Sequence, residues 1–257
     1  MTRPRSVSRW APRVFSAIFA ICLSACSSDP VPAEAAAERG RELFASGALS
    51  ESSLNFYRCV TCHDDHPVSA AVRKAGAALA GAVDRPTYWG GQEDDLLRAV
   101  NACRTYFMYA SAALQPDDPD AVALYAFLSE LVPGDSAAAP FSVVRTVEDL
   151  PRGNAVSGAV LYDRSCAACH GQMHDAAGAL SPRIPLLPEG TLLDHEDLSP
   201  RAQRLVFIEK TCHGGFLGYG GAMPPFSKEV LSDSELPDIL EVLGVVGGGA
   251  VQRPFSE

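Results

Sequence analysis

Apolar residues recur at intervals of three and four positions at residues 120–128 and 235–243, and a shorter helical pattern stands upstream of each, at residues 40–44 and 158–162. This spacing places apolar side chains on one face of a helix, as a helix that packs against a core requires. The first two segments bracket one stretch of the chain, and the last two bracket a second stretch in the same order. The pattern therefore predicts an all-α fold in which one structural unit occurs twice in tandem.

A glycine opens the first predicted helix of each repeat, at Gly40 and Gly158. Glycine inside a helix costs about 1 kcal/mol relative to alanine, because it loses more backbone freedom on folding. That cost is offset where a second backbone comes so close that no side chain fits. We therefore expect another helix to approach closely at each of these two positions.

Segments rich in Ala, Pro, Gly and Ser separate the helical stretches. Such segments are typical of tethers and linkers. Each helical stretch is about a hundred residues long, a usual size for a small domain. The predicted organisation is a signal peptide at 1–25, a tether at 26–37, a first domain at 38–132, a linker at 133–153, a second domain at 154–246 and a disordered tail at 247–257.

The N-terminus combines a basic leader with an apolar run, residues 14–23, that is too short to remain in a bilayer as a spanning helix. These features predict an export signal. The Leu-Ser-Ala-Cys sequence at 23–26 resembles the lipobox of bacterial lipoproteins, which is cleaved before a cysteine that is then acylated. The resemblance implies a lipid anchor at Cys26. The alternative is an ordinary signal peptide followed by a spare thiol.

A lipid anchor at Cys26 would also fix the location of the protein. Each buried methylene contributes about 0.8 kcal/mol, so two or three acyl chains hold a protein on a membrane essentially permanently. Ser27 resembles an outer-membrane sorting signal. We therefore expect an exported protein on the periplasmic side of a bacterial membrane, with the outer membrane favoured.

Two five-residue motifs share the order Cys-x-x-Cys-His, namely Cys59, Cys62 and His63 in the first repeat and Cys166, Cys169 and His170 in the second. In this order two thiols one helical turn apart add to the vinyl groups of a porphyrin, and the adjacent imidazole ligates the iron. Four thiolates in one structural zinc site, or a pair of disulfides, are the alternatives. Neither has a use for the histidine that follows each pair, so the motifs predict two covalently bound haem c groups.

The order of features in each repeat is a helix, Cys-x-x-Cys-His, a loop, a methionine and a C-terminal helix, which resembles class I cytochrome c domains. Two such repeats resemble a dihaem cytochrome c, and this implies a small helical bundle around one haem in each. The Gly-Ala-Met-Pro-Pro-Phe sequence at 221–226 resembles the loop that presents the distal methionine in this family. The resemblance implies that Met223 ligates the second iron, on a loop that its prolines stiffen.

The distal ligand of the first haem is less clearly marked. When the C-terminal helices of the two repeats are aligned on Leu128 and Leu243, Met108 falls on Met223 without a gap. Met108 is therefore the leading candidate for the first iron, although it lacks the proline neighbours of Met223.

Cys103 is the rival of Met108. The segment at 100–108 is similar to one in dihaem cytochromes of thiosulfate-oxidising enzymes, where a cysteine binds iron or carries sulfur substrate. The neighbouring Arg104 is expected to favour the thiolate of Cys103. A disulfide between Cys103 and Cys212 is a further alternative in an oxidising compartment. The remaining alternative is that neither Met108 nor Cys103 ligates the first iron.

Other residues are expected to support the haems. In the cytochrome c family a proline carbonyl accepts the N–H of the proximal imidazole, which fixes the ring. Pro182 and Pro185 are both candidates for this role in the second repeat. Tyr88 and Trp89 are expected to pack on the first porphyrin or bond its propionates, or else to belong to the core.

The charge of the chain is consistent with a role among redox proteins. Cleavage after Ala25 removes four arginines and no acidic residue, so the formal net charge changes from −10 to −14. This charge argues against nucleic acid or anionic lipid as a partner, and it suits encounters with basic patches on redox proteins. A solvated acidic surface without a specific partner is the alternative.

Axial ligation connects these features with function. If both irons carry two axial ligands, neither has an open position for a substrate, and no constellation of catalytic residues is visible. We expect a lipid-anchored electron carrier, not an enzyme, between a quinol-oxidising membrane complex and a terminal oxidase or reductase. One alternative is a dihaem oxidoreductase acting on thiosulfate, another small sulfur compound or peroxide at the first haem. Another is a non-catalytic cytochrome subunit of a larger respiratory complex.

Overall fold

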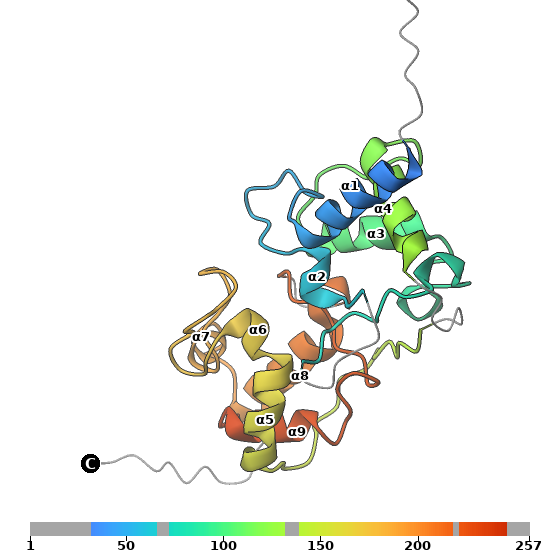
Figure 1. Ribbon diagram of the computed structural model, residues 1–257. Coiled ribbons are helices and arrows are strands. Elements are labelled where there is room, and N and C mark those ends of the chain that lie inside the picture. The colour runs from blue at the N-terminus through green and yellow to red at the C-terminus, as the bar shows by residue number, and fades with distance from the viewer. Residues whose placement is uncertain (1–31, 66–71, 132–138, 218–220, 246–257) are drawn as a thin grey trace, which may run out of the picture. The chain divides into compact units, whose positions relative to one another are not determined.

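Helices make up the regular secondary structure of the computed structural model, which describes residues 32–65, 72–131, 139–217 and 221–245 (Figure 1). The α-helices are α1 (Ala33–Ala45), α2 (Cys59–Cys62), α3 (Leu96–Tyr106), α4 (Pro119–Glu130), α5 (Ala155–Ser165), α6 (Ala167–His170), α7 (Glu189–Leu193), α8 (Pro200–Leu217) and α9 (Leu236–Val242). Two short 3-10 helices are η1 (Ala82–Asp84) and η2 (Trp89–Gly91). The described residues contain one isolated β-bridge and no strand, so the predicted all-α fold class is confirmed.

The predicted signal peptide, the anchor residue Cys26 and the tail at 247–257 lie outside the described residues. In the part of the chain that is described, no helix has both the length and the apolar character needed to cross a membrane.

Each repeat is built on a pair of packed helices. Helix α1 packs against α4 in the first repeat, and α5 packs against α9 in the second (Figure 1). A Cβ atom at Gly40 would lie 2.0 Å from the carbonyl oxygen of Ala123, and one at Gly158 would lie 1.9 Å from that of Asp238. The predicted close approach of a helix at each glycine is confirmed, since no larger residue fits between the two backbones.

The apolar faces of these helices form two hydrophobic cores. The first core includes Leu43, Phe44, Leu124, Phe127 and Leu128, and the second includes Leu161, Tyr162, Leu236, Ile239 and Leu240. Ala75 of the first repeat is buried in the second core, and Ala222 of the second repeat is buried in the first core. Each repeat therefore places one residue in the core of the other, and these contacts join the repeats in addition to the linker.

The structure differs from the predicted tether and linker. Helix α1 begins at Ala33, within the predicted tether, and Ala37 is buried, because alanines favour a helix that has a core to pack against. In the predicted linker, the ring of Phe141 packs edge-on against Trp89 at a centroid distance of 5.7 Å. The backbone N–H of Ser142 donates to Glu229 at 2.9 Å. This part of the linker is held against both repeats, while the remaining predicted boundaries stay predictions.

Replacing Gly158 by alanine tests the helix approach. We expect the free energy of unfolding to fall by about 1–3 kcal/mol, because the new methyl group must displace the backbone of α9. Chemical denaturation measures the change. Ser157→Ala, on the exposed face of the same helix, is the control and should change stability by no more than about 0.5 kcal/mol. Equal stability of Gly158→Ala and the parent protein would contradict the packing described here.

Candidate haem-binding sites

The first Cys-x-x-Cys-His motif forms one short helix and its C-cap. Cys59 and Cys62 are the first and last residues of α2, and His63 follows in an extended conformation. The Nδ1 atom of His63 lies 2.7 Å from the carbonyl oxygen of Ala77. A carbonyl oxygen only accepts, so Nδ1 carries the proton and Nε2 keeps its lone pair, which is the tautomer that a metal requires.

Burial and close packing hold this imidazole in place. Burial lowers the pKa of His63, which favours the neutral ring. A Cβ atom at Gly76 would lie 2.3 Å from Cε1 of His63. The backbone N–H of Gly76 also donates to the carbonyl of Cys62 at 2.8 Å. The ring therefore packs against a backbone segment that only glycine can occupy.

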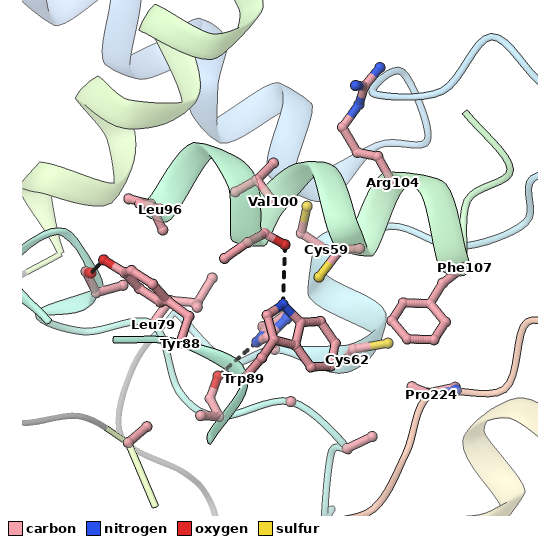
Figure 2. Close-up of a pocket in the computed structure, with 18 of the residues that line it drawn as sticks. Cys59, Cys62, Leu79, Tyr88, Trp89, Leu96, Val100, Arg104, Phe107 and Pro224 are labelled. Carbon is pink, nitrogen blue, oxygen red and sulfur yellow. Dashed lines mark hydrogen bonds between the residues drawn. The ribbon is translucent and has the colours of Figure 1, made fainter. Parts of the chain in front are cut away.

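A predominantly apolar cavity of about 160 Å³ adjoins the first motif. Figure 2 shows Cys59 and Cys62 facing the aromatic side chains of Trp89 and Phe107. The indole N–H of Trp89 donates to the carbonyl of Ala99 at 3.3 Å, and its ring stacks on Phe216 at 4.6 Å. Tyr88 donates its hydroxyl to the carbonyl of Ala82 at 2.6 Å. The polar atoms of Trp89 and Tyr88 thus have protein partners, which leaves these residues a packing role.

Both candidates for the distal ligand of the first haem line this cavity. Met108 is buried, with 4% of its surface exposed, and Cys103 lies on the wall formed by α3. The structure thus brings Met108 and Cys103 to the same cavity as His63, and the choice between them stays a prediction.

The environment of Cys103 favours a thiol. Burial, followed by the neighbouring thiol of Cys59, raises the pKa of Cys103 to about 12. The guanidinium of Arg104 is engaged elsewhere, because it donates to the carbonyls of Leu49 at 2.7 Å and Ala112 at 2.8 Å. The expected stabilisation of a Cys103 thiolate by Arg104 is therefore wrong.

The predicted disulfide alternative is also wrong. Cys103 and Cys212 are both free thiols in the structure. Cys103 faces the first cavity, whereas Cys212 lies on α8 in the second repeat, where its electrostatic neighbours are Asp233 and Lys228.

The second motif begins where α5 ends. Cys166 caps both α5 and α6, and Cys169 and His170 lie in α6. The Nδ1 atom of His170 lies 3.1 Å from the carbonyl oxygen of Pro185, and burial lowers the pKa of the ring. Of the two prolines proposed from the sequence, Pro185 is thus the one that fixes the imidazole.

A second cavity, of about 510 Å³, brings His170 and Met223 together. The Met223 carbonyl accepts the backbone N–H of Gly215 at 2.7 Å, and the N–H of Phe226 donates to the carbonyl of Thr211 at 2.8 Å. Gly214 has φ of 53°, and a Cβ atom there would lie 2.3 Å from the Met223 carbonyl oxygen. These contacts hold the loop that carries Met223 against α8. The sequence pattern did not predict them.

The two cavities share part of their walls. Tyr57 and Cys62 line both of them, and Cys169 packs against the first core. Burial raises the pKa of Tyr57, and the neighbouring thiols of Cys169 and Cys62 raise it further. The two motifs are therefore close neighbours within the fold.

The residues present fit haem c. Each cavity has predominantly apolar walls, two thiols one helical turn apart and a neutral imidazole whose second nitrogen is fixed by a carbonyl. Cationic side chains also line the cavities, with Arg85 at the first, where it donates to the carbonyls of Ala78 at 2.6 Å and Ala80 at 2.9 Å, and Arg183 and Lys210 at the second. A zinc site requires converging ligands, and no group of three or more His, Cys, Asp or Glu side chains converges among the described residues.

Comparison with known proteins supports this assignment in the second repeat. Residues 153–241 match the family described as cytochrome C oxidase, cbb3-type, subunit III. The match contains Cys166, Cys169, His170 and Met223 and supports a c-type cytochrome with covalent haem c. No curated protein matches the chain significantly.

One similar solved structure is a thiosulfate dehydrogenase (TsdBA) from Marichromatium purpuratum in its as-isolated form. The sequences are 17% identical and the TM-score is 0.41, over 93% of this chain and 49% of that chain. The chain thus spans about half the length of that protein, and at this score the likeness does not bear on activity.

Single substitutions on the first cavity separate the two distal candidates. We expect Met108→Ala to remove one of two sets of strongly shifted methionine methyl signals from the NMR spectrum of the reduced holoprotein, because the first iron loses its thioether ligand. Cys103→Ala, on the same wall, should leave both sets in place. The assignment of Met108 is wrong if Met108→Ala retains both sets of methyl signals, or if the parent protein shows only the set of the second haem.

Proposed function

We propose that this chain is a dihaem c-type cytochrome that carries single electrons between other redox proteins of a respiratory chain. One observation carries the proposal. In each repeat a thiol pair, an imidazole fixed by a backbone carbonyl and a methionine line the same buried, predominantly apolar cavity. This combination is what a covalently attached, six-coordinate haem needs from its protein.

The roles of the residues follow from their chemistry. The porphyrins would be attached through the thiols of Cys59 and Cys62 in the first repeat and of Cys166 and Cys169 in the second. The irons would be ligated through Nε2 of His63 and of His170. When bound, the haem supplies reversible one-electron exchange at iron. Met108 and Met223 would offer soft thioether sulfurs, which favour the reduced metal and raise its reduction potential. Apolar walls exclude water and further shape that potential.

Full axial ligation supports a carrier over an enzyme. If His63 and Met108 hold one haem iron and His170 and Met223 hold the other, neither iron would have an open position for a substrate. The protein would then contribute electron exchange, while its partners would perform the chemistry at either end of the chain.

The location and partners are proposed from the sequence. An export signal and acylation at Cys26 would hold the protein on the periplasmic side of a bacterial membrane, with the outer membrane favoured. The net charge of the processed chain suits basic partners at close range. A quinol-oxidising complex as donor and a terminal oxidase or reductase as acceptor fit this position.

Each of two alternative functions is favoured by one observation. The position of Cys103 on the wall of the first cavity favours a second candidate, a dihaem oxidoreductase acting on thiosulfate, another small sulfur compound or peroxide. The family that matches residues 153–241 is described as an oxidase subunit, which favours a non-catalytic subunit of a larger respiratory complex.

Optical and EPR spectra of the purified holoprotein distinguish a carrier from an enzyme. The carrier is expected to show two low-spin haems, each with histidine and methionine ligands. A high-spin signal, or a low-spin signal with a thiolate ligand, would contradict the carrier and support the oxidoreductase. Stable co-purification of unrelated subunits with two unchanged low-spin haems would instead support the non-catalytic subunit.

Removing Met223 tests the second site in isolation. We expect Met223→Ala to abolish the methionine methyl signals of one haem and to lower the midpoint potential of that haem, because the soft sulfur ligand is gone. Met173→Ala is the matched control, since Met173 packs against the same core and does not line the cavity. The proposed ligand is wrong if Met223→Ala retains both sets of methyl signals.

A further inference from the structure

We propose that residues 73–76 form a strap through which the second repeat positions the imidazole of the first haem site. Arg73 is then a positioning residue for His63, a residue that it does not contact. The inference rests on the proposed function, because it takes the first motif to hold a haem. It goes further in making the environment of that haem depend on the other repeat.

The strap is anchored to the second repeat through Arg73. Its backbone N–H donates to the carbonyl of Arg164 in α5 at 2.8 Å. Its guanidinium donates to Glu235 at 2.8 Å and to the carbonyl of Val230 at 3.2 Å. Ala75 adds an apolar anchor, since it is 5% exposed and belongs to the second core.

The same strap holds the first motif through Lys74. Its ammonium group donates to the carbonyls of Val60 at 2.8 Å and His63 at 3.0 Å, and it pairs with Asp64 at 2.8 Å. These carbonyls belong to α2 and its C-terminal cap, where a cation is favourable because the carbonyl groups are not used within the helix.

The end of the strap determines where the imidazole lies. The N–H of Gly76 is bonded to the carbonyl of Cys62, and its Cα packs directly against the His63 ring. The next residue, Ala77, supplies the carbonyl that accepts from Nδ1 of His63. A shift of the strap would therefore move both the surface on which the ring rests and the acceptor that fixes it.

The contacts alternate along the strap. Arg73 and Ala75 contact the second repeat, whereas Lys74 and Gly76 contact the first motif. Four consecutive residues thus contact both repeats. Only three residues separate Arg73 from Ala77, whose carbonyl accepts from His63, so a displacement of Arg73 is expected to shift that carbonyl.

The exchange rate of the His63 Nδ1 proton, measured by NMR in the full holoprotein, tests the strap. In Arg73→Met we expect exchange about tenfold faster than in the parent protein, together with shifts in the methyl signals of the first haem. Glu235→Gln keeps the shape of the partner, lies outside both cavities and should give a smaller change in the same direction. Arg73→Lys should restore most of the protection, because it keeps a cation beside Glu235.

A second Arg–Glu pair provides the control. Arg152 pairs with Glu241 of α9 and contacts no residue of the strap, so Arg152→Met should leave the His63 proton and the first haem unchanged. The proposal is overturned if Arg152→Met accelerates exchange as much as Arg73→Met, or if Glu235→Gln and Arg73→Met both leave exchange unchanged. A parent protein with no haem on the first motif would instead overturn the proposed function.

Discussion

A histidine that ligates a metal through one ring nitrogen almost always donates the proton of the other nitrogen to an acceptor, which fixes the tautomer and the orientation of the ring. The two repeats provide this acceptor in the same way, because the Ala77 carbonyl accepts from His63 and the Pro185 carbonyl accepts from His170. Neither acceptor lies within the motif, so each must be brought to the ring by a loop that folds back. Burial keeps both rings neutral, since a charged imidazole would lose its hydration there. The rest of the fold serves largely to hold these loops in place.

The loops are held by contacts between the repeats as much as by contacts within them. Residues 73–76 connect the second core with the first imidazole, and Ala222, one residue before Met223, is buried in the first core. Tyr57 and Cys62 line both cavities, so a displacement of either side chain alters both sites. The repeats therefore act as one structural unit, and this arrangement suits the proposed exchange of electrons between two haems.

Local chemistry explains which features the sequence predicted. The apolar periodicity and the two helix glycines predicted the packing of α1 on α4 and of α5 on α9. A glycine inside a helix is costly unless a second backbone lies against it, so Gly40 and Gly158 marked the points of contact. The motifs and the Met-Pro-Pro loop predicted which side chains would face each cavity. Helices α3 and α8 were not predicted, since their polar and small residues weaken the periodic signal, and α8 is bent at Gly214. Three features depend on contacts between separate parts of the chain and could not be predicted. They are the carbonyls that Arg104 binds, the choice of Pro185 as acceptor for His170, and the strap. The lipid anchor stays a prediction, as Cys26 lies outside the described residues.

Haem on both motifs is the central claim, and the family match bears on the second motif only. Mass spectrometry of the two peptides that contain Cys59 to His63 and Cys166 to His170 tests it most directly, with protein matured in a bacterium that assembles c-type cytochromes. We predict that each peptide carries the mass of one haem through two thioether bonds. A first-motif peptide with free thiols, or a colourless protein, would contradict the claim.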